Sequence, residues 1–500
     1  MSSVAVVGAG LGGLAAAALM AHRGLAVTVL EKNEAVGGKM GRWTERGYSF
    51  DTGPTLLTMP FVVRELFASV GRSVDDYLRM VPVEPLCRYF YPDGSRLDAF
   101  SDPDRMDAEL QRFAPGDAAG FRRFLEHGRS IYDASAEPFL FSPFGSWNLR
   151  TLWKNLRHLP AVAHLDAFRT LDEAVRDHVH DRRLQQLLNR FATYNGSSPY
   201  RAPATLSLIP AVEFGMGGWY IKGGMYGLAK ALELLARECG AVIRTGCAVR
   251  RVLAGRDGVK GVETETGEVI HTDRVICNAD ALYALRSLIP DAGAERVRRV
   301  EPSLAGFVIM LGVHHRYPAL AHHNVFFSPD YEAEFDALFR RGLPAENPTV
   351  YVSASSAVDP TMAPEGHSNL FILVNAPALP AGNGTHDRSW DWKRNAGGYR
   401  DRVLDLLEER GLADLRRHVV VERMITPEDF RVRFNAFRGA IYGLSSNTRW
   451  SAFLRPSNRV RRIRGLYLVG GSTHPGGGIP LVLLSGRITA GLVMEDAGVA

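Results

Sequence analysis

The stretch 4–33 constrains the fold of this chain more than any other. An apolar run, Val4–Val7, is typical of a buried parallel strand. Three glycines follow it in the spacing G-x-G-x-x-G, and an Ala- and Leu-rich helical pattern then extends to about Arg23. A second apolar run, Ala26–Leu30, predicts another strand. This order of strand, glycine turn, helix and strand predicts a dinucleotide-binding unit.

Each special residue of this unit has a physical role. Gly8 permits the tight turn, Gly10 lets the backbone approach a pyrophosphate, and Gly13 lets helix and strand pack closely. The helix N-terminus offers free N–H groups to the phosphates. Glu31 ends the second strand, where a carboxylate can accept hydrogen bonds from an adenosine ribose. A turn of purely structural role is the alternative, and these residues leave the identity of the dinucleotide open.

Composition narrows the class of protein. The chain has a net charge of +5, 46% hydrophobic and 23% charged residues, which is ordinary for a folded soluble protein. Its 500 residues are too many for one simple core, so we expect two intertwined domains, and the strand–helix–strand unit places the fold in the α/β class. The excess of arginine is dispersed, which gives little support to nucleic-acid binding and fits an anionic membrane surface better. The four cysteines form no C-x-x-C pair, so we expect neither a metal site nor a disulfide framework. We expect the protein to lie in a reducing compartment.

Targeting signals are absent from the sequence pattern. The N-terminus enters the first strand without a signal peptide, and no stretch has the roughly 18 uncharged apolar residues of a spanning helix. One segment, Phe139–Leu171, interleaves aromatic residues with cations such as Arg150, Lys154 and Arg157. It is either a helix that lies in a membrane interface or a core helix with solvated basic residues. We therefore expect a cytoplasmic protein with peripheral membrane contact.

A second loop follows Glu31. It reads Gly37-Gly38-Lys39, and Lys39 could neutralise phosphate charge, although a surface turn is the alternative. The later segment Asp51–Thr55 has strong turn chemistry and offers polar backbone to a cofactor. With the first unit, this loop resembles the FAD-binding half of glutathione-reductase-like flavoproteins, in their amine oxidase and carotenoid desaturase branch.

The resemblance implies FAD as cofactor. It also implies a Rossmann-like FAD-binding domain interleaved with a substrate domain of mixed β-sheet plus helices. In this superfamily the backbone at Val249 clamps the adenine, and the strand that ends at Asn278 lies beside the nucleotide. The predicted cofactor-binding residues are Gly8, Gly10, Gly13, Glu31, Lys32, Gly38, Lys39, Gly53, Thr55, Leu56, Val249, Asn278, Gly471, Gly478 and Ile479.

The domain boundaries follow from the same comparison. The FAD-binding domain is predicted to consist of residues 1–100, 239–290 and 456–500. Residues 101–238 are predicted to form a mainly helical part that faces the substrate or the membrane, and residues 291–455 the sheet and helices of the substrate domain. A further glycine-rich stretch, Gly215–Met225, lacks a preceding strand and the dinucleotide register, so NAD(P) has no visible site. It could line a substrate passage or connect elements.

The C-terminal half contains two near-continuous apolar runs, Phe307–Val313 and Asn369–Asn375. They predict central strands of a mixed sheet, which either floors an apolar cavity or is sandwiched without one. Histidines at 314, 315, 322 and 323 form two adjacent pairs. Since adjacent residues of a strand point to opposite sides, neither pair makes a metal site, and we interpret all four as loop residues.

The last specific signal is the stretch Gly465–Arg487, a buried strand, a turn containing Thr-His-Pro-Gly, and a helix. It resembles the C-terminal signature of bacterial carotenoid desaturases of the phytoene desaturase type. Gly477 departs from that signature, and the surrounding residues look more like relatives that act late in the pathway, such as hydroxycarotenoid 3,4-desaturases and diapocarotenoid oxygenases. The helix N-terminus would lie beside the flavin ring.

The implied reaction removes two hydrogens from a lipid-soluble carotenoid, with hydride transfer to flavin N5 and quinone or oxygen as the final electron acceptor. His474 is a candidate acceptor for the accompanying proton, and the alternative is that it shapes its turn. Three other functions stay open: a carotenoid oxygenase, a flavin amine oxidase, and a non-catalytic isoprenoid-binding chaperone. The Thr-His-Pro-Gly turn argues against the amine oxidase, and the intact glycines with Glu31 argue against the chaperone.

Overall fold

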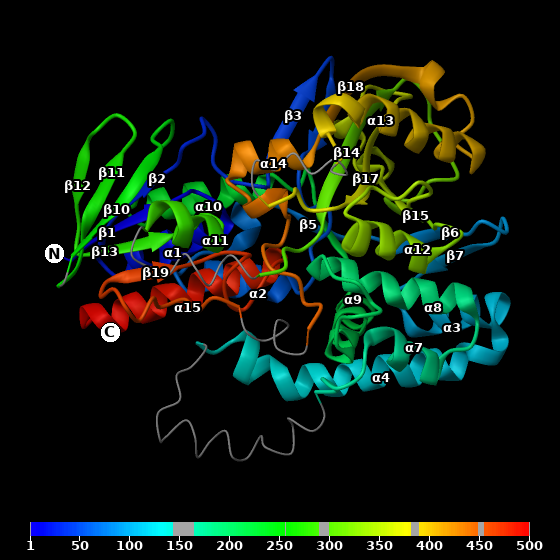
Figure 1. Cartoon of the computed structure of the whole chain (residues 1–500), viewed down its shortest axis with the longest axis horizontal. Coiled ribbons are helices and arrows are strands. Elements are labelled where there is room, and N and C mark those ends of the chain that lie inside the picture. The colour runs from blue at the N-terminus through cyan, green and yellow to red at the C-terminus, as the bar shows by residue number, and fades with distance from the viewer. Residues whose placement is uncertain are drawn as a thin grey trace.

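The computed structural model describes residues 2–143, 165–255, 257–289, 300–381, 390–448 and 455–499. Figure 1 shows two halves placed side by side, with both termini in the left-hand one. Blue, green and red segments, which lie far apart in the sequence, meet in that half. The N-terminal unit, the segment near 240–280 and the C-terminus therefore build one domain together, as the resemblance implied.

A parallel sheet forms the centre of this half, in the order β19-β13-β1-β2-β9. Its strands are β1 (Ser3–Val7), β2 (Ala26–Leu30), β9 (Val242–Arg244), β13 (Arg274–Cys277) and β19 (Leu466–Leu468). A separate antiparallel sheet contains β10 (Val249–Gly255), β11 (Gly258–Thr264) and β12 (Val269–His271). Because β1 is the middle strand, the glycine turn that follows it lies at the centre of the carboxyl edge of the sheet.

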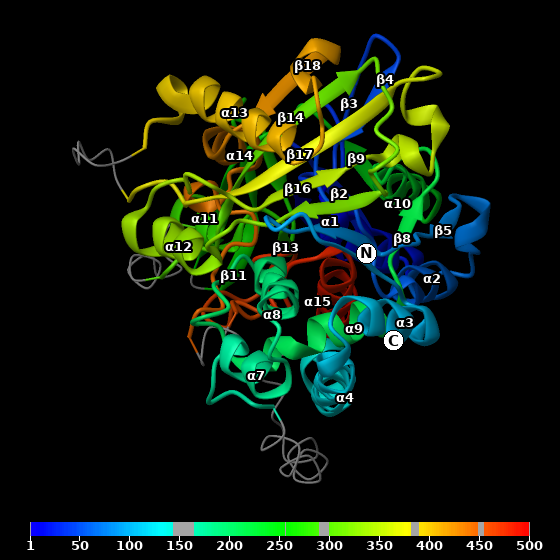
Figure 2. The ribbon, with the colours of Figure 1, turned by 90° about the vertical axis from the view of Figure 1, so that its right-hand side faces the viewer.

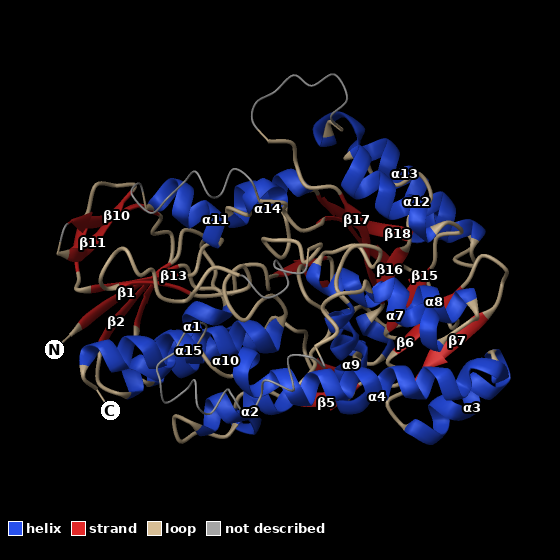
Figure 3. Cartoon of the chain, turned by 60° about the horizontal axis from the view of Figure 1, so that its bottom comes forward, coloured by secondary structure: helices blue, strands red, loops and turns tan. Residues whose placement is uncertain are grey.

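Helices α1 (Leu11–His22), α10 (Gly227–Glu238) and α15 (Ile479–Ala497) pack together along this sheet (Figure 3). The α1 helix can approach α15 closely because its alanines, Ala15 to Ala18, are fully buried and small. On α15, a Cβ at Gly486 would lie 2.8 Å from the Gly12 carbonyl oxygen. This close packing brings the N-termini of both helices to one place.

The other half contains a mixed sheet in the order β18-β14-β17-β16-β15-β6-β7. Its strands are β6 (Cys87–Phe90), β7 (Arg96–Ala99), β14 (Ala305–Val313), β15 (His323–Phe326), β16 (Val350–Ser353), β17 (Ser368–Ala376) and β18 (Val419–Ile425). The pairing of β15 with β6 is parallel and the others are antiparallel. The predicted mixed sheet, with two apolar runs as interior strands, is confirmed.

Helices cover both faces of this sheet. Figure 2 shows α4, α7, α8 and α9 on one side and α13 on the other. The bounds on the first side are α3 (Pro103–Phe113), α4 (Ala118–Ser135), α7 (Leu171–His178), α8 (Arg182–Asn189) and α9 (Leu208–Met216), and α13 spans Trp392–Glu409. Along β14, Phe307 and Ile309 pack in the core with α13, whereas Val308 and Met310 pack in a different cluster. The alternation of a strand thus gives each face its own core.

The shorter elements complete the chain. They are α2 (Pro60–Ala68), α11 (Ala281–Tyr283), α12 (Tyr331–Asp336), α14 (Pro427–Phe434), β3 (Arg42–Glu45), β4 (Tyr48–Asp51), β5 (Met80–Pro82) and β8 (Trp219–Ile221). The glycine-rich stretch 215–225 is firmly attached: β8 pairs with β5, and the backbone N–H groups of Met225 and Tyr226 donate to Asp51.

Two of the expected domain boundaries are displaced. The hairpin β6–β7, assigned to the first FAD-binding segment by its position before residue 100, joins the seven-stranded sheet instead. The α10 helix, assigned to the helical part, packs on α1 in the dinucleotide half. Both errors have the same cause. Strand pairing and helix packing between segments far apart in the chain cannot be predicted from the local sequence of either segment.

Most of the segment proposed for a membrane interface, residues 144–164, lies outside the described residues. Its predicted membrane contact therefore stays a prediction. None of the helices in the described ranges combines the length and the apolar character that crossing a membrane requires.

Candidate flavin and substrate site

A single cavity of about 540 Å³ extends from the glycine loops of the dinucleotide half to the face of the seven-stranded sheet. The N-terminal residues of α1 and α15 line it, through Gly10, Leu11, Gly478 and Ile479. Both helices begin at a glycine whose side chain cannot supply a cap, so the first-turn N–H groups remain for a ligand. Two positive helix ends facing one cavity favour an anionic cofactor.

Asn278, which follows β13, organises the first glycine loop. Its side-chain Nδ2 donates to the Gly8 carbonyl oxygen at 3.1 Å. A Cβ on Gly10 would lie 2.6 Å from that Nδ2, and one on Gly470 would lie 2.9 Å from Asn278 Oδ1. The amide therefore fills the space between the turn before α1 and the turn after β19. Only glycine fits at either contact, which leaves room for a pyrophosphate above the backbone.

Glu31 holds the carboxyl edge of β1 and β2 together. One carboxylate oxygen, Oε2, accepts from the Ala9 N–H at 2.8 Å. The other, Oε1, accepts from the Asn33 N–H at 2.9 Å and from Asn33 Nδ2 at 2.7 Å. Glu31 is 4% exposed and lines the cavity, and its carboxylate has acceptor capacity beyond these three bonds, so its contact with the ribose stays a prediction.

The second loop contributes a half-buried lysine, Lys39. Lys39 donates to the Ile441 carbonyl oxygen and lines the cavity. Burial lowers the pKa of Lys39, and the nearby Asp280 carboxylate opposes that shift. Burial raises the pKa of Asp280, which lines the same cavity. This pair places a cation next to the glycine loops, where it can neutralise phosphate charge.

The structure brings nearly all predicted cofactor residues to one cavity. Those that line it are Gly8, Gly10, Glu31, Lys32, Gly38, Lys39, Gly53, Thr55, Leu56, Val249, Asn278, Gly471, Gly478 and Ile479. Gly13 lies behind the loop, where a Cβ would be 2.5 Å from the Gly8 carbonyl oxygen. It acts through packing, as expected. Lys32 also donates to the Val432 carbonyl oxygen at 2.7 Å, which ties the loop to α14.

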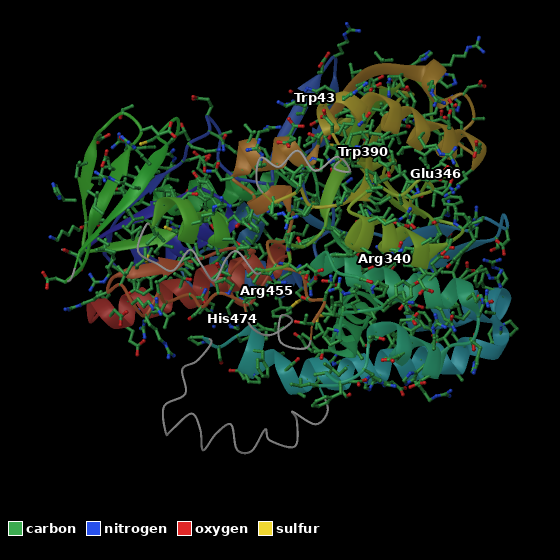
Figure 4. The ribbon with its side chains drawn as sticks, viewed as in Figure 1. Trp43, Arg340, Glu346, Trp390, Arg455 and His474 are labelled. Carbon is green, nitrogen blue, oxygen red and sulfur yellow. The ribbon has the colours of Figure 1, made fainter. Side chains whose placement is uncertain are left out.

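His474 is placed differently. It is 4% exposed and does not appear among the described residues that line the cavity. Its Nε2 donates to the Ser142 carbonyl oxygen at 3.0 Å, and burial lowers its pKa. Figure 4 labels it close to Arg455, near α15. This position fits the alternative role, in which the imidazole shapes the turn before α15, and its catalytic role stays a prediction.

The departure at Gly477 has a structural reason. A Cβ at this residue would lie 2.7 Å from Cδ1 of the Tyr442 ring. Tyr442 also lines the cavity, and it occupies the space that a larger residue at this position of the signature would take. The glycine and the tyrosine are therefore matched to each other.

The cavity continues over one face of the seven-stranded sheet. Cross-strand partners on this face form a row from Val308 on β14 through Leu373, Tyr351 and Val325 to Tyr89 on β6. The first four of these line the cavity. The sheet thus forms the floor of a large and mostly apolar space. This confirms the first of the two alternatives for the mixed sheet, a sheet that floors a cavity.

Sequence reasoning missed several polar residues of this lining, among them Arg190, Glu213, Asp280, His323 and Tyr351. No motif marks them. One signal was available: Glu213 is the single charged residue within the apolar helix Leu208–Met216 and is 3% exposed. A buried charge in an apolar helix indicates a polar partner or a ligand.

The interpretation as a loop residue is wrong for His323 and correct for His322, which lies in the bend just before β15. His323 begins β15, and both side chains are 2% exposed. The flanking Ala and Asn gave no strand signal, and burial was decided by the neighbouring strands. Among the described residues neither ring nitrogen of His322 has a hydrogen-bond partner, while His323 Nδ1 and the Tyr351 hydroxyl lie 2.7 Å apart. Burial lowers the pKa of His322 to about 3 and holds the pKa of His323 well below its usual range.

These histidines predict a loss of stability in mild acid. The unfolded chain binds a proton at His322 near pH 6.5, whereas the folded chain binds it only near the lowered pKa of about 3. The free energy of unfolding should therefore fall by roughly 1.4 kcal/mol for each pH unit below about 6.5 for this residue alone. Urea titrations between pH 7.5 and 5 measure it. His322→Leu should make the pH dependence shallower, and exposed His271→Gln should not; equal slopes in all three proteins would contradict the assignment.

The fold and this cavity define a dinucleotide-binding flavoprotein with a substrate chamber. The residues fit FAD: the cavity is lined by glycines that leave no space for a Cβ, by two helix ends without a side-chain cap, by the half-buried Lys39 and by Glu31, which is predicted to contact the ribose. The model of the family described as flavin containing amine oxidoreductase matches residues 11–494. The chain belongs to this family, in its branch of carotenoid desaturase type, and is an FAD-dependent oxidoreductase.

Relatives of known name cover the whole chain. A 4,4'-diapolycopene oxygenase of Methylomonas sp is 38% identical, with 99% of this chain and 98% of that protein covered. A zeta-carotene-forming phytoene desaturase of Myxococcus xanthus is also 38% identical, over 99% and 94% of the two chains. A 4,4'-diaponeurosporene oxygenase of Staphylococcus aureus is 34% identical, over 97% of each.

Solved structures agree in fold. An oxidoreductase from Methanosarcina mazei covers 99% of this chain, and 100% of its own length is matched, with a TM-score of 0.64 at 19% identity. Cyclohexylamine oxidase from Brevibacterium oxydans has a TM-score of 0.64 at 16% identity, with 99% of both chains covered. At these identities the likeness establishes the fold alone.

Proposed function

We propose that this protein is a carotenoid desaturase that removes two hydrogens from a long polyene, with a 1-hydroxycarotenoid (3,4-desaturation) or phytoene as substrate. The observation that carries the proposal is the continuity of the cavity. One end is built from the glycine loops and helix ends that fit FAD, and the other is floored by the row from Val308 to Val325. An extended apolar substrate can therefore reach the cofactor without leaving the protein.

Bound FAD would supply the oxidising chemistry, by accepting a hydride at N5. The chain's own residues hold and shield the reactants. Thr55 of the flavin loop is joined to the substrate sheet, because its Oγ1 lies 2.6 Å from the Tyr351 hydroxyl. His323 continues this chain of hydrogen bonds at Tyr351. Since His323 has a strongly lowered pKa, it stays neutral and orients Tyr351 rather than storing the proton.

A carotenoid oxygenase is the second candidate. It is favoured by the names of two relatives, which are oxygenases and are as similar to this chain as the desaturase or nearly so. The same fold and cavity would serve both reactions. The products differ, because desaturation lowers the mass of the pigment by two hydrogens whereas oxygenation raises it by oxygen.

Expression in cells that accumulate different carotenes tests the proposal. Phytoene, an acyclic hydroxylated carotene and a C30 analogue should be offered separately, and the pigments identified by mass and absorbance. We expect the wild-type protein to convert one of these carotenes into a pigment that has lost pairs of hydrogens and absorbs at longer wavelength. A Gly13→Ala variant should leave the same carotene unchanged. A gain of oxygen instead would select the second candidate, and unchanged pigments in every strain would contradict both.

The electron acceptor and the location belong to the same proposal. We propose quinone or oxygen as acceptor, and a cytoplasmic protein attached peripherally to the membrane in which the carotenoid dissolves. The net charge of +5 supports attraction to an anionic surface. Growth of the expressing cells without oxygen separates the two acceptors, and recovery of all the protein in the fraction without membranes would contradict the attachment.

A further inference from the structure

A cluster of buried polar side chains, with two of opposite charge, faces the cavity at the β6 end of the substrate sheet. Arg190, Tyr194 and Glu213 all line the cavity, and they come from the segment after α8 and from α9. Arg190 is 8% exposed and Glu213 3% exposed. Polar groups buried this deeply are costly unless they have partners, so the arrangement requires a reason.

The contacts within the cluster use only part of its capacity. Arg190 Nη2 donates to the Tyr89 hydroxyl at 2.9 Å and lies 3.8 Å from Glu213 Oε1. The Tyr194 hydroxyl donates to Glu213 Oε2 at 2.6 Å. Within the described ranges Arg190 Nε has no hydrogen-bond partner. A guanidinium carries several N–H donors and no acceptor, so the cluster has donors to spare.

Aromatic rings fix the guanidinium in place. Its central carbon lies 5.4 Å from the ring centroid of Tyr89, 4.8 Å from that of Phe191 and 5.3 Å from that of Tyr194. These contacts and the bond to Tyr89 hold the donors in a fixed direction. A ligand atom that accepts a hydrogen bond would thus meet a preorganised partner.

The charge of the cluster limits what it can receive. The Glu213 carboxyl lies beside the guanidinium and can balance its charge, so the site does not call for an anion. A hydrocarbon end would leave the spare donors buried without a partner. A neutral oxygen, in a hydroxyl or carbonyl group, supplies the missing acceptor without adding charge.

The cluster lies at a defined distance along the sheet from the contact with the flavin loop. Tyr351, which contacts Thr55 of the flavin loop, lies on β16, and Tyr89 lies two strands away on β6. Adjacent strands are separated by about 4.8 Å, so the cluster lies about 10 Å along the sheet from that contact. An oxygen bound there fixes how far the polyene enters the cavity.

We propose that Arg190, assisted by Tyr194, binds a hydroxyl or carbonyl oxygen at one end of the polyene and so makes the enzyme selective for oxygenated carotenoids over hydrocarbons. The inference rests on the proposed function, because it concerns the substrate of the same cavity. It assigns Arg190 to substrate specificity and not to the transfer of hydrogen.

The test compares an acyclic carotene with its 1-hydroxy derivative in the same detergent, using the FAD-loaded enzyme. The readouts are KM in turnover and bleaching of the flavin absorbance when oxygen is excluded. We expect the wild type to have a KM for the hydroxylated substrate about 10- to 100-fold lower. Arg190→Met should raise that KM by a similar factor and leave the KM for the hydrocarbon unchanged or lower.

Two further variants keep the test decisive. Arg190→Met combined with Glu213→Leu removes both charges, so a loss of folding caused by an unpaired carboxylate is avoided, and it should lose selectivity like the single variant. Tyr91→Phe is the matched control, since Tyr91 is buried on the chain just after β6 and its hydroxyl donates to the Arg183 carbonyl oxygen outside the cavity lining. It should keep the selectivity of the wild type.

The outcomes separate the two levels of the proposal. Equal KM values for both substrates in the wild type, or an equal change for both in Arg190→Met, would overturn the role of Arg190 while the proposed function stands. If neither polyene bleaches the flavin of the wild type, the proposed function and this inference are both overturned.

Discussion

Replacing Gly13 by alanine is expected to give a protein that is purified without FAD. A Cβ at Gly13 would lie 2.5 Å from the Gly8 carbonyl oxygen, well inside contact distance. That oxygen also accepts the hydrogen bond from Asn278 Nδ2, so it cannot move without loosening the turn from β13. The loop and the N-terminus of α1 must separate, which displaces the N–H groups that face the cofactor. We expect FAD affinity to fall by at least about 100-fold, equivalent to about 3 kcal/mol.

The same substitution elsewhere gives the control. Gly491 lies on the exposed side of α15, and a Cβ there would meet no atom within 4 Å. Gly491→Ala should therefore retain FAD and be more stable, by up to about 1 kcal/mol, because alanine favours the helix. The flavin absorbance of the purified proteins and titration of the apoproteins with FAD measure the difference. Equal FAD affinity in both variants would show that close packing at Gly13 is not required.

Glu31→Ala is expected to have the second large effect. The substitution removes the acceptor of three donors, the backbone N–H groups of Ala9 and Asn33 and the side-chain Nδ2 of Asn33. The N–H of Ala9, which is fully buried, then loses its partner, at a cost of about 1–3 kcal/mol. If Glu31 also accepts from the ribose, that bond is lost as well. FAD affinity should fall by about 100-fold or more.

Glu34 offers the matched control, since it is exposed and only three residues away. Glu34→Ala changes the charge of the same loop region and should leave FAD affinity within a factor of about two, because the effect of an exposed charge is screened. Fluorescence titration with FAD measures both variants. If Glu31→Ala binds FAD as well as Glu34→Ala does, neither the ribose contact nor the support of the loop by this carboxylate is correct.

Much of the dinucleotide half could be predicted from the sequence, because its signals are local. The run Val4–Val7, the glycine spacing and the run Ala26–Leu30 each describe a short segment whose backbone requirements are met by its own residues. The C-terminal turn and the helix that follows it, Ile479–Ala497, were recognisable for the same reason. Tight turns require glycine and buried strands require a continuous apolar run, and both patterns can be recognised in a single sequence.

The substrate half was less predictable. Its interior strands Ala305–Val313 and Ser368–Ala376 were evident as apolar runs, but the short strand His323–Phe326 was not, because a histidine and an asparagine precede its apolar residues. Its burial is set by pairing with β6 and β16, which lie far from it in the chain. The same holds for the hairpin Cys87–Ala99, whose membership of the large sheet depends on the parallel partner β15.

The sequence by itself determined the cofactor class, the glycine loops that line the cavity and the interleaving of the two parts of the fold. Only the tertiary structure decided which residues line the substrate space, where His474 lies, and that Arg190, Glu213 and Tyr89 meet. The physical reason is the range of the interactions. Turns and helix ends are specified by neighbouring residues, whereas a buried polar cluster is assembled by side chains from separate elements, and its location depends on how the whole chain packs.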